Sequence, residues 1–426
     1  LTLTAAPGPI ALGGAATAGG LLYNGGAPGP TIRARAGERA RIRLVNALGE
    51  PTIVHWHGLI VPESADGQPR SAIASGTTFD YDFPVVQRAG TSWYHPHAHH
   101  RTASQLHRGL AGFFLIGDAE EDALGLPTGA REHLLLLQDR SGDADAYTYA
   151  PTRDDALVGI LRDVPYGNGV ARPRLTLDGA RHRLRVLNAS QARVYRLARS
   201  DGRPLTVIGN DGGLLAAPVE VPDVWLGVGE RVDLLVDGRS IPEGGRIMLR
   251  SLPFTIAVGP TVAIPQGIPM DLVELVRGAG SAPAEPPLPP VLSSIPALAP
   301  ADPTVRTFVF RSPSPESHLI DGRAWDMDRI DGQVPFGRTE RWRFVNDSTV
   351  PHPVHLHGTH FQVVARTGGR GEVYPYERGW KDTVLLLPLE SADVLVRFDR
   401  YRGVYLLHCH NLQHEDAGMM LNLRVG

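Results

Sequence analysis

GERARIRLVN, residues 37–46, is the stretch that decides the predicted fold of this chain. It begins with a glycine, alternates polar and apolar residues, and ends with an asparagine. Alternation with a period of two is typical of a β-strand with one buried face, and glycine and asparagine favour turns. The stretch therefore predicts one strand between two turns.

The same pattern occurs twice more, as GARHRLRVLN at residues 179–188 and as GRTERWRFVN at residues 337–346. The copies begin 142 and 158 residues apart, and a period of that length indicates homologous domains rather than a solenoid. Chain length alone allows about two to four domains. Three copies favour three domains, each a β-sandwich of short strands, and the 48 Gly and 36 Pro residues suit such an all-β chain.

Two segments rich in Pro, Gly or Ala separate the predicted domains. Residues 117–130 are polar and would close the first domain, whereas residues 278–303 are rich in Pro and Ala and predict an extended, fairly stiff connector. The predicted organisation is a first domain at 1–118, a second at 119–277, the connector, and a third at 304–426.

Composition favours an ordinary globular protein. The net charge is −3 with no long run of one sign, so nothing favours nucleic acid or an anionic membrane as a partner. No apolar run reaches membrane-spanning length. Because Leu1 stands where an initiator Met would, we expect a processed protein that is periplasmic or secreted, although an artificial start would look the same.

The only cysteine lies in HCHNLQHEDAGMM, residues 408–420, so internal disulfides are excluded. His414 follows Cys409 by five residues and Met419 follows it by ten. Cys, two His and a weak axial Met form the ligand set of a blue-copper site, so one more histidine must come from elsewhere. The alternative is a buried core cysteine with histidine neighbours, and the spacing of His414 and Met419 argues against it.

Neighbouring side chains on a strand point to opposite faces. Cys409 would therefore face one way, and His408 and His410 the other. The stretch predicts two metal centres on opposite faces of one strand, joined by short covalent paths that suit electron transfer.

Four His-x-His pairs occur, two in the first predicted domain and two in the third: His55/His57, His95/His97, His355/His357 and His408/His410. Residues i and i+2 of a strand share a face, so each pair presents two imidazoles. If these domains pack together, eight imidazoles converge, which is too many for one ion and enough for three coppers. His352 best fills the remaining position beside Cys409. The middle domain has only His133 and His182, unpaired, and is predicted to be structural.

These motifs resemble those of the three-domain multicopper oxidases, the laccase-like cupredoxin family, along the whole chain. The resemblance implies three consecutive cupredoxin-like Greek-key domains and four coppers per chain. It implies that the type 1 copper is held by His352, Cys409, His414 and Met419. It implies that the type 2 copper is held by His55 and His355, one type 3 copper by His57, His95 and His410, and the other by His97, His357 and His408.

The resemblance also implies an oxidase. In such enzymes the type 1 copper takes single electrons from a small-molecule substrate, and they pass through Cys409 and its neighbours to the clustered coppers, where O2 is reduced to two waters. Asp66 and Glu415 match carboxylates thought to relay protons in bacterial relatives. The alternative for both is an ordinary surface or turn acid, since Asp-Gly is also a turn signal.

Several residues depart from the family pattern or stand outside the ligand set. Asn411 occupies an often aliphatic place, so it could alter the type 1 potential, and Met419 leads us to expect a low-to-middle potential. Trp380-Lys381-Asp382 resembles a family segment near the type 1 copper, with Asp382 as a partner of a ligand there. Seven other histidines are interpreted as structural or solvated: His99, His100, His107, His133, His182, His318 and His360.

The leading functional hypothesis is a laccase that oxidises phenols and aromatic amines. The alternative within the family is a metallo-oxidase acting on Cu(I), Fe(II) or Mn(II); Met248, Met270 and Met327 form no cluster, which weighs against Cu(I). An electron carrier or a copper buffer is the alternative outside the enzymes, and the paired histidines with a cysteine between two of them argue against both. We expect a monomer with no membrane span and no nucleic-acid partner.

Overall fold

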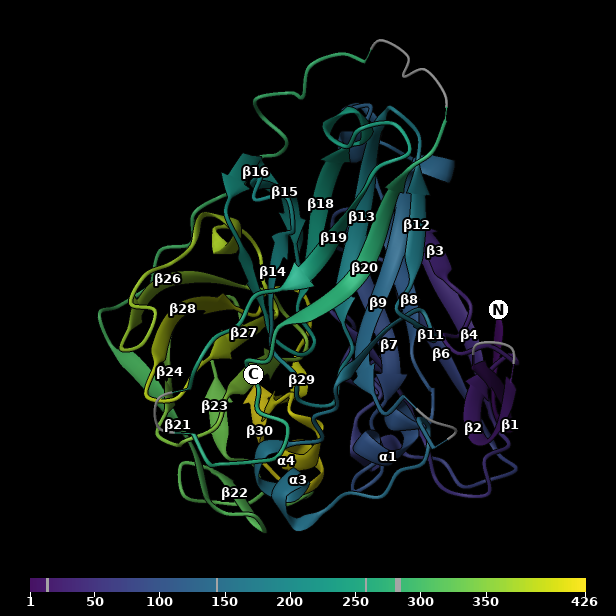
Figure 1. Ribbon diagram of the computed structural model, residues 1–426. Helices are drawn as coiled ribbons and strands as arrows, with labels where there is room; N and C mark the ends of the chain where they lie inside the picture. Colours follow the sequence, from purple (N-terminus) through teal and green to yellow (C-terminus); the bar gives the residue numbers. More distant parts are fainter. Residues whose placement is uncertain (13–14, 143–144, 257–258, 280–284) are drawn as a thin grey trace.

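The computed structural model of the protein describes residues 1–12, 15–142, 145–256, 259–279 and 285–426. The described chain is built mainly of short strands (Figure 1), which confirms the all-β prediction. It has four short α-helices: α1 (Thr102–His107), α2 (Ala119–Asp122), α3 (Arg153–Val158) and α4 (Leu412–Asp416). None of the helices in the described ranges has the length and apolar character needed to cross a bilayer.

Residues 2–117, which we name the first unit, form two four-stranded sheets. The first sheet has the spatial order β2 (Ala15–Tyr23), β1 (Thr2–Leu12), β4 (Arg39–Asn46) and β6 (Thr78–Pro84). The second has the order β3 (Ile32–Arg35), β8 (Gly112–Gly117), β7 (Gly90–Pro96) and β5 (Val54–His57).

Residues 132–277, the middle unit, form a seven-stranded and a five-stranded sheet. The larger sheet has the order β11 (Val170–Ala171), β10 (Val164–Gly167), β9 (Glu132–Arg140), β13 (Arg181–Asn188), β18 (Arg231–Asp237), β15 (Leu205–Asn210) and β16 (Gly213–Val221). The smaller has the order β12 (Arg174–Leu177), β20 (Met270–Arg277), β19 (Arg246–Ser251), β14 (Tyr195–Arg199) and β17 (Val224–Leu226).

Residues 305–425, the third unit, form two five-stranded sheets. The first has the order β22 (Ser317–Ile320), β21 (Val305–Ser314), β24 (Thr339–Asn346), β28 (Ser391–Arg397) and β26 (Phe361–Thr367). The second has the order β23 (Gly332–Val334), β30 (Met420–Val425), β29 (Gly403–Cys409), β25 (His352–Leu356) and β27 (Thr383–Leu386).

The three repeated stretches form β4, β13 and β24, which occupy equivalent places. Each pairs in parallel with the first strand of its unit and antiparallel with a later one. The terminal asparagines also act alike: Asn46 accepts from the Leu48 N–H (3.0 Å) and donates to the Glu50 carbonyl (2.9 Å), and Asn188 and Asn346 bond equivalent backbone groups. In the outer units this corner leads into β5 and β25, which carry histidine pairs.

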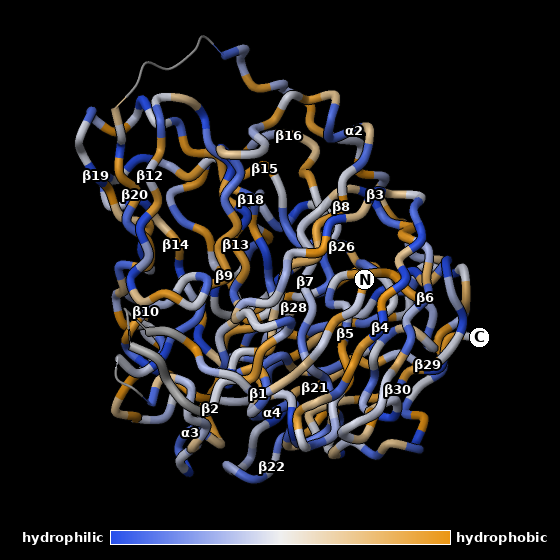
Figure 2. Tube along the Cα trace, turned by 90° about the vertical axis from the view of Figure 1, so that its right-hand side faces the viewer, coloured by the Kyte–Doolittle hydropathy of each residue, from blue (hydrophilic) through white to orange (hydrophobic). Residues whose placement is uncertain are grey.

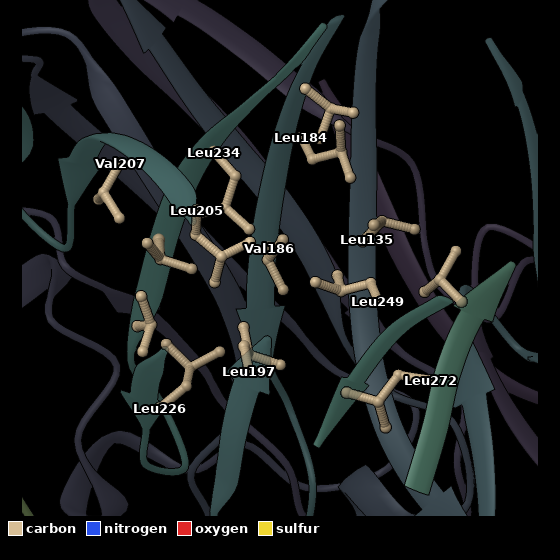
Figure 3. Packing of buried hydrophobic residues seen from close by; sticks show 14 of the residues in the cluster. Leu135, Leu184, Val186, Leu197, Leu205, Val207, Leu226, Leu234, Leu249 and Leu272 are labelled. Carbon is tan, nitrogen blue, oxygen red and sulfur yellow. The ribbon is translucent and has the colours of Figure 1, made fainter. Parts of the chain in front are cut away.

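Each unit packs an apolar core between its two sheets. In the middle unit Leu184, Val186 and Leu234 from the larger sheet meet Leu197 and Leu249 from the smaller one (Figure 3). Polar and apolar residues alternate along many strands (Figure 2), as expected when one face of a strand is buried.

The outer units lie on opposite sides of the molecule in Figure 1, the first in purple and blue and the third in green and yellow, with the middle unit between and above them. Two sheets in each unit fit the predicted domains, whose boundaries stay predictions. In the connector, residues 285–303 contain no helix or strand; Leu292 bonds the backbone of Ala216, and Leu298 bonds the Gln362 side chain. Residues 280–284 lie outside the described part.

Candidate metal centres

Cys409 lies between two histidines at the end of β29. Its Sγ is 3.3 Å from His352 Nδ1 and 3.6 Å from His414 Nδ1, and these two nitrogens are 3.2 Å apart. Met419 is buried beside them; its carbonyl accepts from the Cys409 N–H (3.1 Å). We name these four residues the cysteine set. Thiolate, imidazole and thioether are donors that copper prefers.

The loop after β29 brings His414 back over the sulfur. Asn411 caps α4, and the helix carries His414. The Asn411 backbone N–H points at Cys409 Sγ (3.4 Å), whereas its side-chain amide donates to the Val158 carbonyl of α3 (3.2 Å). Asn411 therefore reaches the sulfur through its backbone and ties the loop to the middle unit through its side chain.

The eight paired histidines converge at the interface of the outer units, and we name them the histidine cluster. Strand pairing sets their positions: β5 pairs with β7 so that His55 opposes His95, and β25 pairs with β29 so that His355 opposes His408. All eight are at most 1% exposed. His408 and His410 belong to this cluster while Cys409 between them belongs to the cysteine set, as the alternation along a strand requires.

Ring nitrogens of the cluster face one another. His55 Nε2 lies 3.3 Å from His355 Nε2. Two further groups have nitrogens within 4.8 Å of one another: His57, His95 and His410, and His97, His357 and His408. These are the triads that the family resemblance implies for the type 3 coppers; their assignment to particular ions stays a prediction.

Most cluster histidines point their other nitrogen at a protein acceptor. His55 Nδ1–H donates to the Asp66 carbonyl (2.8 Å), and His95 Nδ1–H to the Pro96 carbonyl (2.9 Å). His57 is turned the other way, since Nε2–H donates to Asp382 Oδ1 (3.0 Å) and Nδ1 faces His410. Metal-bound histidines almost always donate their second N–H in this manner.

The cluster fits a cation. Burial, and then the neighbouring imidazoles, lowers the pKa of His97 and of His410 well below the usual value, so both rings are neutral and available as ligands. His97 Nε2 is buried with no hydrogen-bond partner among the described residues. Buried polar atoms are normally satisfied, and a metal would satisfy the inward-facing nitrogens.

Both predicted carboxylates lie against the cluster. Asp66 Oδ2 accepts from His357 Nδ1–H (2.9 Å). Glu415 lies between His97 Nδ1 (3.5 Å) and His408 Nδ1 (3.4 Å), and neither of its oxygens has a hydrogen-bond partner in the described part of the chain. Burial raises the pKa of Glu415 well above its usual value. Their role in proton transfer stays a prediction.

The prediction that Asp382 lies beside the type 1 ligands is wrong. β27 pairs with β25 so that Thr383 opposes His355, which places Asp382 at the histidine cluster. Burial alone would raise the pKa of Asp382, but the Arg231 guanidinium holds it well below the usual value. Sequence reasoning missed Arg231, because the middle unit carries no paired histidines that would draw attention to it.

None of the seven remaining histidines belongs to these sets among the described residues. His318 is buried and stacks on His414, with ring centroids 4.0 Å apart. His360 Nε2–H donates to the Gly58 carbonyl (3.0 Å), and His133 bonds His182 in the middle unit (2.9 Å). His99, His100 and His107 lie elsewhere in the first unit.

Known proteins share this arrangement. Multicopper oxidase family models match residues 5–121 and 296–426. A bilirubin oxidase from Albifimbria verrucaria is 33% identical over 409 residues, which cover 93% of this chain and 71% of the relative. The chain belongs to the multicopper oxidase family. A laccase from Bacillus stratosphericus is 31% identical over 459 residues, covering 93% of this chain and 89% of that protein.

The crystal structure of the multicopper oxidase McoA from Aquifex aeolicus matches with a TM-score of 0.90 at 32% identity, covering 100% of this chain and 95% of that one. Multicopper oxidases are oxidoreductases with cupredoxin-like domains and four coppers of types 1, 2 and 3. The predicted family, fold class, enzyme class and cofactor are thereby confirmed, and the histidine groups agree with that cofactor.

Proposed function

We propose that this multicopper oxidase is laccase-like and couples one-electron oxidation of phenols and aromatic amines to the reduction of O2 to water. In this proposal the cysteine set holds the type 1 copper, His55 and His355 hold the type 2 copper, and the two histidine triads hold the type 3 pair. Bound copper would supply the one-electron redox chemistry.

The observation that carries the proposal is an apolar cavity of about 340 Å³ beside the cysteine set. Val350 and Pro351 line it immediately before His352, and Val158 of α3 lines it from the middle unit. Pockets with predominantly apolar walls suit small organic molecules. A phenol bound here would lie against the protein layer that covers the cysteine set.

That layer is thin. The His414 Nε2–H donates to the Leu157 carbonyl (2.8 Å), and the next residue, Val158, lines the cavity. His414 itself is fully buried, so the ring does not meet solvent directly. On the far side Cys409 is joined through one peptide bond each to His408 and His410 of the histidine cluster.

The lining disfavours a metal ion as the substrate. None of the described residues that line the cavity is an Asp, Glu, His, Cys or Met. Fe(II) and Mn(II) prefer oxygen or nitrogen donors, and Cu(I) prefers soft sulfur donors. A hydrated cation would gain no carboxylate, imidazole or sulfur ligand there, whereas an aromatic ring gains apolar contact.

Asp66 and Glu415 are proposed to hold and deliver protons at the histidine cluster. Each is buried and lies next to imidazole Nδ1 atoms. Glu415 is suited to keep a proton at neutral pH because of its raised pKa. Export to the periplasm or beyond is part of the proposal, and cell fractionation would test it.

Measurements on copper-loaded protein test the proposed function. We would measure copper per chain and the visible absorption, then O2 uptake with a phenol and separately with Cu(I). Four coppers, an intense blue band and phenol-driven uptake are expected. Uptake with Cu(I) alone would contradict the laccase proposal in favour of a metallo-oxidase, and one copper without uptake would leave an electron carrier.

A variant pair tests the cavity. Val262 lines it, and Val262→Glu places a carboxylate among apolar side chains. We expect KM for a neutral phenol to rise roughly 10-fold. Val170→Glu, on an exposed strand away from the cavity, is the matched control and should leave KM unchanged. Equal KM values in both variants would contradict the assignment of the cavity.

A further inference from the structure

The middle unit carries no proposed copper ligand, but it forms one wall of the histidine cluster. A Cβ atom placed on Gly229 would lie 2.9 Å from His57 Cε1 and 3.2 Å from His410 Cδ2. The glycine backbone therefore touches one cluster histidine from each outer unit. Its N–H donates to the carbonyl of Asn188 (2.9 Å), the asparagine that ends the middle copy of the repeat.

Arg231, two residues further on, begins β18 and is 1% exposed. All five of its guanidinium N–H groups have acceptors. Nη1 and Nη2 bond the two carboxylate oxygens of Asp382 at 2.7 and 2.5 Å. Nε bonds the Thr91 carbonyl (2.8 Å), and the two remaining N–H groups bond the carbonyls of Gly229 and Asp211 (2.9 Å each). One side chain thus connects all three units.

Asp382 connects Arg231 to the histidine cluster. Its Oδ1 accepts from His57 Nε2–H (3.0 Å) and from the Thr383 hydroxyl (2.9 Å). A neutral imidazole carries a single N–H, so an acceptor at Nε2 selects the tautomer with a lone pair on Nδ1. His57 Nδ1 is the nitrogen that faces His410 Nε2 (3.1 Å).

We propose that Arg231 is a positioning residue for the clustered coppers: it holds both oxygens of Asp382, which fixes His57 with Nδ1 toward the metal. This rests on the proposed function, in which the cluster binds copper. The middle unit then takes part in building the site. The competing interpretation is a buried ion pair that only joins the units.

Arg183 offers a matched control. It is also a buried arginine of the middle unit and bonds Asp233 there and Glu121, which follows the first unit. No described contact joins Arg183 to a cluster histidine. Arg183→Gln and Arg231→Gln each remove a buried arginine from an ion pair, and only the second should reach the cluster; after Arg183→Gln, Arg185 still contacts Glu121 and Asp233.

The test exposes copper-loaded proteins to a chelator. We would follow three quantities: copper per chain, the blue absorption of the cysteine set, and the electron paramagnetic resonance of the clustered coppers. Arg231→Gln should release cluster copper at a roughly 10- to 100-fold lower chelator concentration than wild type, with the blue band unchanged. Arg231→Lys should lie between, because an ammonium group cannot bond both oxygens and three carbonyls in one plane. Arg183→Gln should retain copper as wild type does.

A double variant distinguishes an effect that passes from Arg231 through Asp382 to His57 from a general loss of stability. Asp382→Asn should weaken copper retention as Arg231→Gln does, and the two changes together should cost no more than one, because they interrupt the same contact chain. Additive losses would overturn the proposal, as would equal copper retention in Arg231→Gln and Arg183→Gln. If Arg231→Gln does not fold, wild-type copper retention and resonance in Arg231→Lys would overturn it. A wild-type chain without cluster copper would refute the proposed function itself.

Discussion

Replacing Glu415 by Gln gives the sharpest test of the proposed proton supply. The carboxyl is 1% exposed and lies 3.5 Å from His97 Nδ1 and 3.4 Å from His408 Nδ1. Gln has nearly the same shape and removes the exchangeable acid proton. Because a positioned acid contributes about 10²- to 10⁴-fold to a rate, kcat should fall by that factor.

The stability of this variant should move the other way. Burial raises the pKa of Glu415, so the folded copper-free chain holds a proton that the unfolded chain releases above its ordinary value near 4.5. The stability from this group is full below that value and is lost as pH rises toward the folded pKa. Gln has no such loss, so at pH 7 the copper-free variant should be at least as stable as wild type.

Stopped-flow absorption separates the two half-reactions. Anaerobic bleaching of the blue band by a phenol should be unchanged, because Glu415 does not line the apolar cavity. Return of the colour on mixing with O2 should be slow. Asp416→Asn is the control: this neighbouring carboxylate bonds the N–H groups of Thr102 and Ala103 and contacts no cluster histidine. Reoxidation within about 3-fold of wild type in Glu415→Gln would refute a role worth 10²-fold.

Three further changes have defined outcomes. Cys409→Ser should abolish the blue absorption while metal analysis still finds copper at the histidine cluster, because the sulfur serves only the cysteine set. His107 has a pKa lowered by burial and by Arg140, so stability should fall by up to about 1.4 kcal/mol per pH unit as pH drops below 6.5, and His107→Gln should flatten that slope in denaturant unfolding. Leu234→Ala in the middle core should cost about 2–5 kcal/mol in the same assay, with copper content unchanged.

The local part of the fold, which is the strands and the turns that end them, was predictable from the sequence. A period of two over eight residues identifies β4, β13 and β24, and the asparagine that ends each strand marks a real corner, because its side chain bonds the backbone of the turn. The partners of these strands were not predictable. β1 and β4 pair in parallel with partners 41 residues apart in the sequence, and nothing in either strand encodes which neighbour it takes.

The ligand sets were also predictable, because they depend on a local pattern within one strand. Alternation along a strand places His408 and His410 on one face and Cys409 on the other, whatever else the chain does. Asp382 was misplaced because its position depends on the register between β27 and β25, which links residues distant in sequence. Arg231 was missed because its contacts cross 151 residues and three units, and a lone arginine in a strand has no distinguishing pattern.

The histidine cluster explains why this chain needs its units to be held together accurately. Four of its imidazoles come from the first unit and four from the third, all almost without exposure, so each unit alone would present an incomplete site. Copper that binds only the assembled interface stabilises that interface by mass action. Before copper arrives, hydrogen bonds across the interface hold the outer units together, such as the one from His357 Nδ1–H to Asp66 Oδ2 (2.9 Å). Contacts such as the five hydrogen bonds of Arg231 must then keep the two halves in register, and the middle unit supplies them from a position that neither outer unit can reach.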